Sequence, residues 1–112
     1  MGEIDMQMQE LVRAIRKSSD YTQYQILYEE IKKDQELFGR VNDYRRSRFV
    51  LEMKEDEDLI GKMNQLKWDY SDILNKSLVK EFLSAEQRYV KLFRQIQDTV
   101  TEAMNLDIGF LE

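Results

Sequence analysis

The sequence predicts an all-α protein, an antiparallel helical bundle of about five helices that ends in a long C-terminal amphipathic helix. Three observations support this. The 112 residues include no proline and only four glycines, so the turn residues that all-β folds require are scarce. The helix formers Glu, Gln, Lys, Arg, Leu and Met dominate the composition. Apolar residues recur at helical spacing along most of the chain. At this length we expect a single domain over residues 1–112.

The first predicted helix spans residues 3–17. Its apolar residues recur at intervals of three and four and therefore share one face: Ile4, Met8, Leu11, Val12 and Ile15. Glu3 and Asp5 stand at its start, and Arg16 and Lys17 stand at its end. This order of charges is the one that the helix dipole favours.

The second predicted helix spans residues 21–33. Asp20, followed three residues later by Gln23, predicts a capping box at its start. Three tyrosines lie on its apolar face, which comprises Tyr21, Tyr24, Leu27, Tyr28 and Ile31. They form either a ligand platform or phosphorylation cluster, or part of the core. Because they share the face with two aliphatic residues, we interpret them as core residues whose hydroxyls reach the edge of the bundle.

The third and fourth helices follow at the same spacing. Asp34 is predicted to cap the third, which runs to about residue 54 with the apolar face Leu37, Phe38, Val41, Tyr44 and Leu51. The acidic string at 55–58 is either a solvated break or the first turn of the fourth helix. The fourth helix is predicted over 59–74, with the face Leu59, Ile60, Met63, Leu66, Tyr70 and Leu74. Ser77 is the candidate cap of the next helix.

The last helix, from about 78 to 105, is the longest. Phe82, Tyr89, Ile96 and Ala103 repeat every seven residues, and further apolar residues on both sides extend the arc to roughly half the circumference. A surface helix needs a stripe only a little over 100° wide, so we expect this helix to meet neighbours on more than one side. Residues 106–112 form a tail whose order the sequence leaves open. Its Phe110 and Leu111 either fold back onto the bundle or dock on another chain.

The composition narrows the classes of function. Seventeen basic and twenty-two acidic residues give a net charge of −5, which disfavours a general nucleic-acid binder. Cysteine and histidine are absent, which removes the commonest nucleophile, acid–base and transition-metal groups. We therefore predict no enzyme activity, no metal site and no cofactor. The polar start is unlike a signal peptide, and no apolar run is long enough to span a membrane, so we predict a cytoplasmic protein without membrane insertion.

Three features break the helical pattern and mark candidate sites. Arg48 lies in the apolar face of the third helix, within the basic string YRRSRF. The arginines of this string either run along the edge of the core with their charged ends in water, or form a small site for RNA phosphate from Arg45, Arg46 and Arg48. Glu86 lies within the apolar arc of the last helix and needs a partner. We expect an ion pair with Arg45 or Arg48, inside the bundle or across a subunit interface. Trp68 points away from the apolar face of its helix, and with the wide last helix it favours self-association.

Several strings, in this order, resemble the YlbF/YmcA family of small helical bacterial regulators. Ser19, Tyr21 and Tyr24 match the family's Ser-x-Tyr-x-x-Tyr, and Asp34 begins its Asp-x-Glu-Leu, although Gln35 stands where the family often has proline. The string LNKSLVKEFLSAEQRYVKLFRQI matches the closing segment at Val79, Phe82, Leu83, Ala85 and Glu86. The similarity spans nearly the whole chain. Each motif alone is common in helical proteins, so their order and spacing carry the resemblance.

The resemblance implies a non-enzymatic protein that forms a homo-oligomer, or a hetero-oligomer with related helical proteins. Family members act as accessory factors in competence, sporulation and biofilm control, in a complex that adjusts RNA processing by a membrane-anchored ribonuclease. For some members it also implies an iron–sulfur cluster on cysteines, which this chain lacks. Three hypotheses follow: an adaptor that acts through helix–helix contacts, a self-assembling structural or chaperone-like bundle, and an RNA-binding module built on the three arginines.

Overall fold

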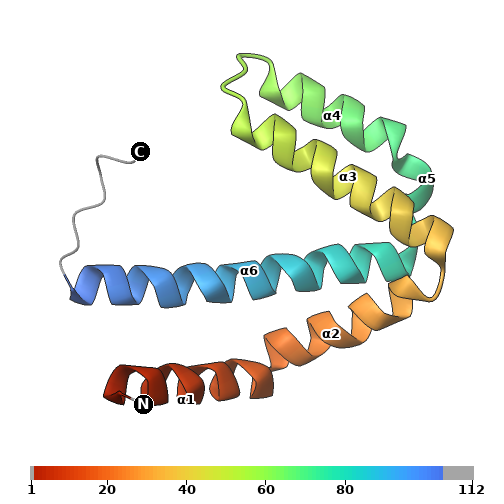
Figure 1. Ribbon diagram of the computed structural model, residues 1–112. Coiled ribbons are helices and arrows are strands. Elements are labelled where there is room, and N and C mark those ends of the chain that lie inside the picture. Colours follow the sequence, from red (N-terminus) through yellow and green to blue (C-terminus); the bar gives the residue numbers. More distant parts are fainter. Residues whose placement is uncertain (1, 105–112) are drawn as a thin grey trace.

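The fold is all-α, as the sequence predicts. The computed structural model describes residues 2–104, which form six helices and no strand (Figure 1). The helices are α1 (Glu3–Lys17), α2 (Ser19–Lys32), α3 (Gln35–Met53), α4 (Leu59–Asp69), α5 (Ser71–Leu74) and α6 (Ser77–Ala103). The predicted tail residues Phe110 and Leu111 lie outside the described residues.

A single serine joins α1 to α2. Ser18 has an extended backbone, and its Oγ accepts a hydrogen bond from the Tyr21 backbone N–H at 3.3 Å. The same Oγ donates to the Ile15 carbonyl at 2.6 Å, so one side chain satisfies backbone groups at both helix ends. The predicted capping box on Asp20 is therefore wrong. Ser18 caps α2 instead, because it is the residue at which the chain leaves the helical conformation.

The cap predicted for the third helix is confirmed. Asp34 is extended, and its Oδ1 accepts a hydrogen bond from the Leu37 backbone N–H at 3.1 Å. The carboxylate also favours the positive end of the helix dipole. The observed α3 ends at Met53, one residue before the predicted end.

The region predicted as one helix over 59–74 is two helices. The chain leaves the helical conformation at Tyr70 (φ −109°, ψ 18°), which separates α4 from α5. No glycine or proline marks this break in the sequence. After it, the Asp72 carboxylate lies 2.9 Å from Arg40 on α3, and the Arg40 guanidinium lies 5.0 Å from the Tyr70 ring. The predicted cap at Ser77 is also wrong, because Ser77 is already helical and the flanking Lys76 supplies no side-chain bond.

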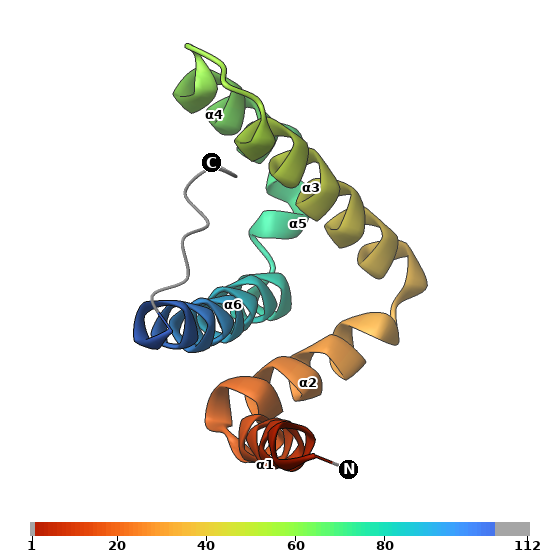
Figure 2. The ribbon, with the colours of Figure 1, turned by 60° about the vertical axis from the view of Figure 1, so that its left-hand side comes forward.

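The helices form two arms that meet at one end of the molecule. In one arm, α2 and α6 lie side by side and run in opposite directions, and α1 continues beyond α2 (Figure 1). In the other arm, α3 and α4 form a hairpin that points away from the first arm (Figure 2). The short α5 connects the hairpin to α6 at the junction. The helices α2 to α6 therefore meet at a junction, and α1 lies at the far end of the first arm.

The hydrophobic core lies where the arms meet. Its buried members come from five helices: Ile31, Val41, Tyr44, Leu66, Ile73, Val79 and Phe82. The helix α1 contributes no buried residue. Away from the junction, therefore, each arm has little core of its own.

The chain is more open than a compact monomer. Its radius of gyration is 17.5 Å, whereas a compact domain of this length has a value of about 13 Å. Its accessible surface is 8930 Å², whereas a compact monomer of this mass exposes about 6500 Å². The molecule therefore exposes more surface than a compact monomer of the same mass.

Candidate interaction surface

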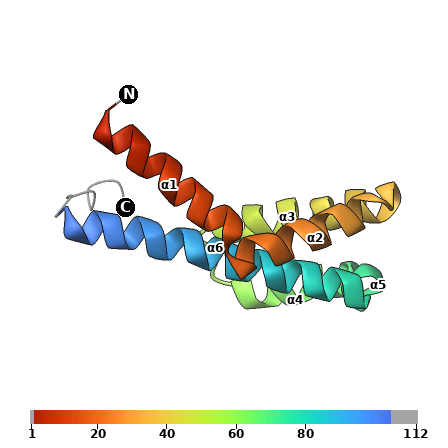
Figure 3. The same ribbon diagram turned by 90° about the horizontal axis from the view of Figure 1, so that it is seen from below.

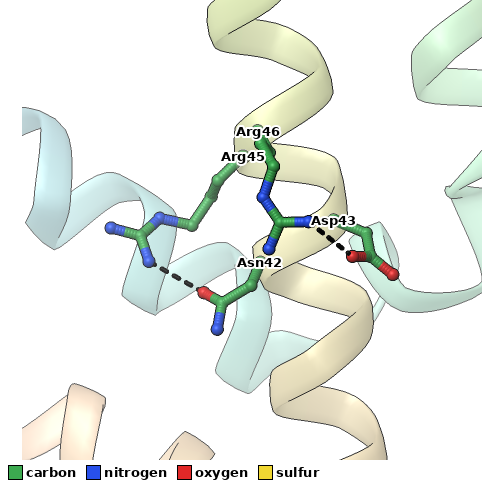
Figure 4. A network of polar contacts seen from close by, with 4 residues as sticks. All are labelled: Asn42, Asp43, Arg45 and Arg46. Atoms are coloured by element: carbon green, nitrogen blue, oxygen red, sulfur yellow. Dashed lines mark hydrogen bonds and ion pairs between the residues drawn. The ribbon is translucent and has the colours of Figure 1, made fainter.

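An arginine and a glutamate connect the two arms. Arg45 on α3 and Glu86 on α6 are both partly buried, and Arg45 Nη2 lies 2.6 Å from Glu86 Oε2. The contact lacks the alignment of a hydrogen bond, so it is chiefly electrostatic. Arg45 also donates a hydrogen bond to Asn42 Oδ1 at 2.9 Å (Figure 4), and its guanidinium lies 5.5 Å from the Phe82 ring. The carboxylate in the apolar arc of α6 thus faces a cation at the core edge.

The other two arginines of the basic string have carboxylate partners on their own helix. Arg46 Nη1 lies 3.4 Å from Asp43 (Figure 4), and Arg48 Nε lies 3.0 Å from Glu52. Arg48 is therefore not the partner of Glu86, although the sequence left that pairing open. Because each of the three arginines faces a carboxylate, the string provides little net positive field for an RNA backbone.

The tyrosines of α2 pack in an aromatic cluster against α6. The Tyr24 ring stacks on Phe82 with centroids 5.6 Å apart, and Tyr21 meets Tyr89 edge to face at the same distance. Tyr28 packs against Phe38 and Phe82. Burial raises the pKa of the Tyr24 hydroxyl, and it also raises the pKa of Tyr89. These contacts support the interpretation of the tyrosines as packing residues.

The first half of α6, residues 77–89, is covered by other helices. Val79, Phe82 and Ala85 are buried there, where α6 packs against α2 and α5 and where Arg45 of α3 lies beside the Phe82 ring. We call this segment the covered half. The prediction that α6 meets neighbours on more than one side is correct for this segment.

The second half of α6, residues 90–103, continues the same apolar arc without the same cover. Val90 is 41% exposed, Phe93 47% and Val100 56%. The helix α2 does not extend along this part of α6, and the α3/α4 hairpin points away from it (Figure 1). We call this segment the uncovered half.

The apolar stripe of α1 is uncovered as well. Four of its five apolar residues are more than 40% exposed: Ile4, Met8, Leu11 and Val12. Seen from below, α1 and the uncovered half start close together and separate toward the N-terminus of α1 (Figure 3). Apolar residues of α1 and of the uncovered half are therefore exposed on two helices of the same arm.

Trp68 is 75% exposed on α4. It lies on the other arm, apart from α1 and the uncovered half. An open groove of about 590 Å³ runs between α3 and α4 and is lined by Val50, Leu51 and Leu66 together with charged residues of both signs. The structure thus places the sequence-predicted candidates in different regions. Arg45 and Glu86 pair between α3 and α6, while Trp68 is exposed near the end of α4.

The described part shows no cluster of metal-ligating side chains. Within residues 2–104, no group of three Asp or Glu side chains is placed to hold a metal ion, and the sequence has no cysteine for an iron–sulfur cluster. Thiolate ligation of such a cluster therefore does not fit this chain. None of the helices in that range combines the length and the apolar character needed to cross a membrane.

The sequence did not single out the stripe of α1 as a site. The spacing of its apolar residues predicts a helix that buries one face. The spacing does not show whether another part of the same chain covers that face. The Arg40–Asp72 ion pair carried no signal either, because its residues stand 32 positions apart.

Comparison with known proteins gives a consistent result. Residues 4–105 match the family described as "Control of competence regulator ComK, YlbF/YmcA". A "UPF0342 protein" of Caldicellulosiruptor saccharolyticus is 27% identical over 109 residues, covering 92% of this chain and 91% of the relative. A "UPF0342 protein" of Caldicellulosiruptor bescii is 26% identical over 98 residues, covering 85% and 82%. No solved structure matches the chain.

Proposed function

Because the chain belongs to the YlbF/YmcA family, which is linked to control of the competence regulator ComK, we propose that it is a regulatory adaptor that binds other helical proteins. The observation that carries this proposal is the apolar surface on α1 and the uncovered half. Large apolar residues exposed along a helix face are typical of an interaction site. An amphipathic helix of a partner is the natural ligand, because helix faces interlock by packing side chains into grooves.

The partners that we propose are a second copy of this chain and related chains of the same family. Such chains would present the same two kinds of apolar face. The role requires no catalytic step and places the protein in the cytoplasm with its partners. A ribonuclease complex is one assembly in which such an adaptor could act.

Affinity capture from the native host tests the proposal. The bait is the wild-type chain, compared with Phe93→Asp in the uncovered half. We expect the wild type to retain a family relative or a ribonuclease, and Phe93→Asp to lose it, since a buried charge without a partner opposes binding. The matched control is Ile60→Asp, because Ile60 is 79% exposed on the other arm; this variant should bind as the wild type does.

Two outcomes contradict the adaptor. Capture that is equal for all three baits would show that the uncovered half is not the binding surface. Recovery of many unfolded proteins, in place of a defined partner, would favour the chaperone-like bundle.

A further inference from the structure

We propose that a cavity between the α3/α4 hairpin and the covered half of α6 binds a phosphate monoester with a small apolar body. The cavity has a volume of about 330 Å³ and is lined by side chains of α3, α4, α5 and α6. We call it the basic cavity. The inference goes beyond the adaptor role, because it concerns a small ligand and a part of the chain other than α1 and the uncovered half.

Three cations line the basic cavity, and each comes from a different helix. Arg48 belongs to α3, Lys67 to α4 and Lys80 to α6. Within residues 2–104, no carboxylate lines the cavity. In a chain with a net charge of −5, this is a local reversal of the overall charge. It indicates an anionic ligand, because a recess lined by one sign of charge concentrates ions of the other sign.

The amount of charge favours a phosphate group. Arg48 Nε lies 3.0 Å from Glu52 on its own helix, so one of the three cations is balanced. In the described part of the chain, neither Lys67 nor Lys80 has an ion-pair partner. Two positive charges therefore remain, and a phosphate monoester carries a charge of about −1.5 to −2 at pH 7. A carboxylate carries only one negative charge and would leave one lysine unmatched.

Two neutral side chains of α6 add hydrogen-bond donors. Ser84 and Gln87 both line the basic cavity. Ser84 Oγ accepts a hydrogen bond from Arg88 Nη1 at 2.8 Å, and Arg88 Nη2 is held by Gln23 of α2 at 3.2 Å. The O–H of Ser84 is thus left to donate, and the amide of Gln87 supplies further N–H donors. These donors suit the three acceptor oxygens of a phosphate monoester.

The rest of the lining is apolar and favours an ester over inorganic phosphate. Met63, Leu74 and Leu83 line the cavity, are partly buried, and pack against the hydrophobic core. A bare phosphate ion would leave these side chains in contact with water, whereas an apolar substituent would cover them. The volume of about 330 Å³ is at the lower end of the range for ligand sites. We therefore expect a substituent of a few carbon atoms.

A ligand in the basic cavity would contact both arms of the molecule. Lys67 belongs to the hairpin, whereas Lys80 and Ser84 belong to α6. From the junction, the hairpin and α6 point in different directions (Figure 1). A ligand that binds groups on both arms stabilises the arrangement in which those groups come together. Occupancy of the cavity would therefore restrict the angle between the arms.

Calorimetric titration of the full chain with n-butyl phosphate tests the site. We expect one ligand to bind per chain, and Lys67→Gln and Lys80→Gln each to raise Kd about tenfold, as expected for the loss of a hydrogen bond between charged groups. Both lysines are exposed, so neither change removes a core contact, and circular dichroism checks that the variants are folded. The matched control is Lys62→Gln, which makes the same change of charge on α4 but lies at the α3/α4 groove. It should leave Kd unchanged.

Further titrations define the class of ligand. Inorganic phosphate should bind more weakly than n-butyl phosphate, and n-butanol should not bind. The inference would be overturned if the wild type fails to bind n-butyl phosphate, or if both lysine variants bind it as the wild type does. Lysine-dependent binding to phosphatidic acid vesicles, without binding of n-butyl phosphate, would also overturn it, because the cations would then serve a membrane surface. The affinity capture that tests the adaptor role is independent of these results.

Distances between spin labels test the contact with both arms. The chain has no cysteine, so Glu57→Cys, between α3 and α4, and Gln97→Cys, on α6, introduce two labelling sites at exposed positions. The labelled chain is diluted with unlabelled chain, so that only distances within one chain contribute. We expect n-butyl phosphate to narrow the distribution of distances, and Lys80→Gln to abolish the narrowing. A distribution unchanged by bound ligand would overturn the contact with both arms.

Discussion

The two halves of α6 carry the same apolar arc but have different surroundings. In the covered half, Phe82 is fully buried and stacks on Tyr24. In the uncovered half, Phe93 occupies nearly the same angular position, three turns later, yet is 47% exposed. The hydrophobic pattern of a helix records that a face is to be covered, but it does not record which chain supplies the cover. That distinction separates the residues that stabilise this fold from those that we propose bind a partner.

Truncating the two phenylalanines gives the largest contrast. Phe82→Ala should lower the free energy of unfolding by about 3–5 kcal/mol, because it leaves a cavity in the small core at the junction. In dilute solution, Phe93→Ala should lower the free energy of unfolding by less than about 1 kcal/mol. The same change should weaken self-association. Urea denaturation followed by far-UV circular dichroism, at several protein concentrations, measures both effects. Equal losses in dilute solution would remove the distinction between the halves.

Removing Glu86 tests the polar contact that closes the covered half. Glu86→Ala leaves the partly buried Arg45 without its carboxylate, so the free energy of unfolding should fall by about 1–3 kcal/mol, between the values for exposed and buried pairs. A double-mutant cycle with Arg45→Ala isolates the coupling between the two side chains. The exposed pair Asp43 and Arg46 serves as the control and should show about 0.5 kcal/mol or less. A coupling no larger than that control would refute the structural role of the pair.

The serine between α1 and α2 lies where the cover of α6 ends. Ser18→Ala removes the acceptor of the Tyr21 N–H and should cost about 1 kcal/mol. Hydrogen exchange should accelerate in the first turn of α2, since its N–H groups lose a partner. Asp34→Ala removes the equivalent cap of α3 and should accelerate exchange only there. Unchanged exchange at Tyr21 in Ser18→Ala would show that the bond contributes little.

Alkaline pH should weaken the packing of α2 on α6 by a smaller amount. Burial raises the pKa of Tyr24, an effect to which Glu86 and Tyr28 add and which Arg45 opposes; burial also raises the pKa of Tyr89. The folded state thus holds these protons more tightly than the unfolded state. Stability is fully present below the ordinary tyrosine pKa of about 10 and falls as pH rises above it. Thermal unfolding from pH 8 to 11 measures this slope, which Tyr24→Phe should reduce. A slope unchanged in Tyr24→Phe would assign the effect to other groups.

Local features of the sequence predicted most of the elements. Helical spacing identified α1, α2, α3 and α6 to within one or two residues, because a core-facing stripe must recur every three or four positions. Asp34 was identified as a cap because it is a short acceptor directly before an apolar run. The cap of α2 was misassigned because serine and aspartate at 18–20 are all good caps, and only the backbone conformation selects Ser18. The break at Tyr70 had no local signal.

The sequence by itself determined that this protein is helical, that α6 bears an apolar arc wider than a surface helix needs, and that Glu86 requires a cation. Those properties depend on residue type and spacing along one helix. Only the tertiary structure decided that Arg45 is that cation, that α4 and α5 separate, and that α1 and the end of α6 stay exposed. These depend on contacts between residues distant in sequence, and the spacing within one helix carries no information about what lies opposite its face.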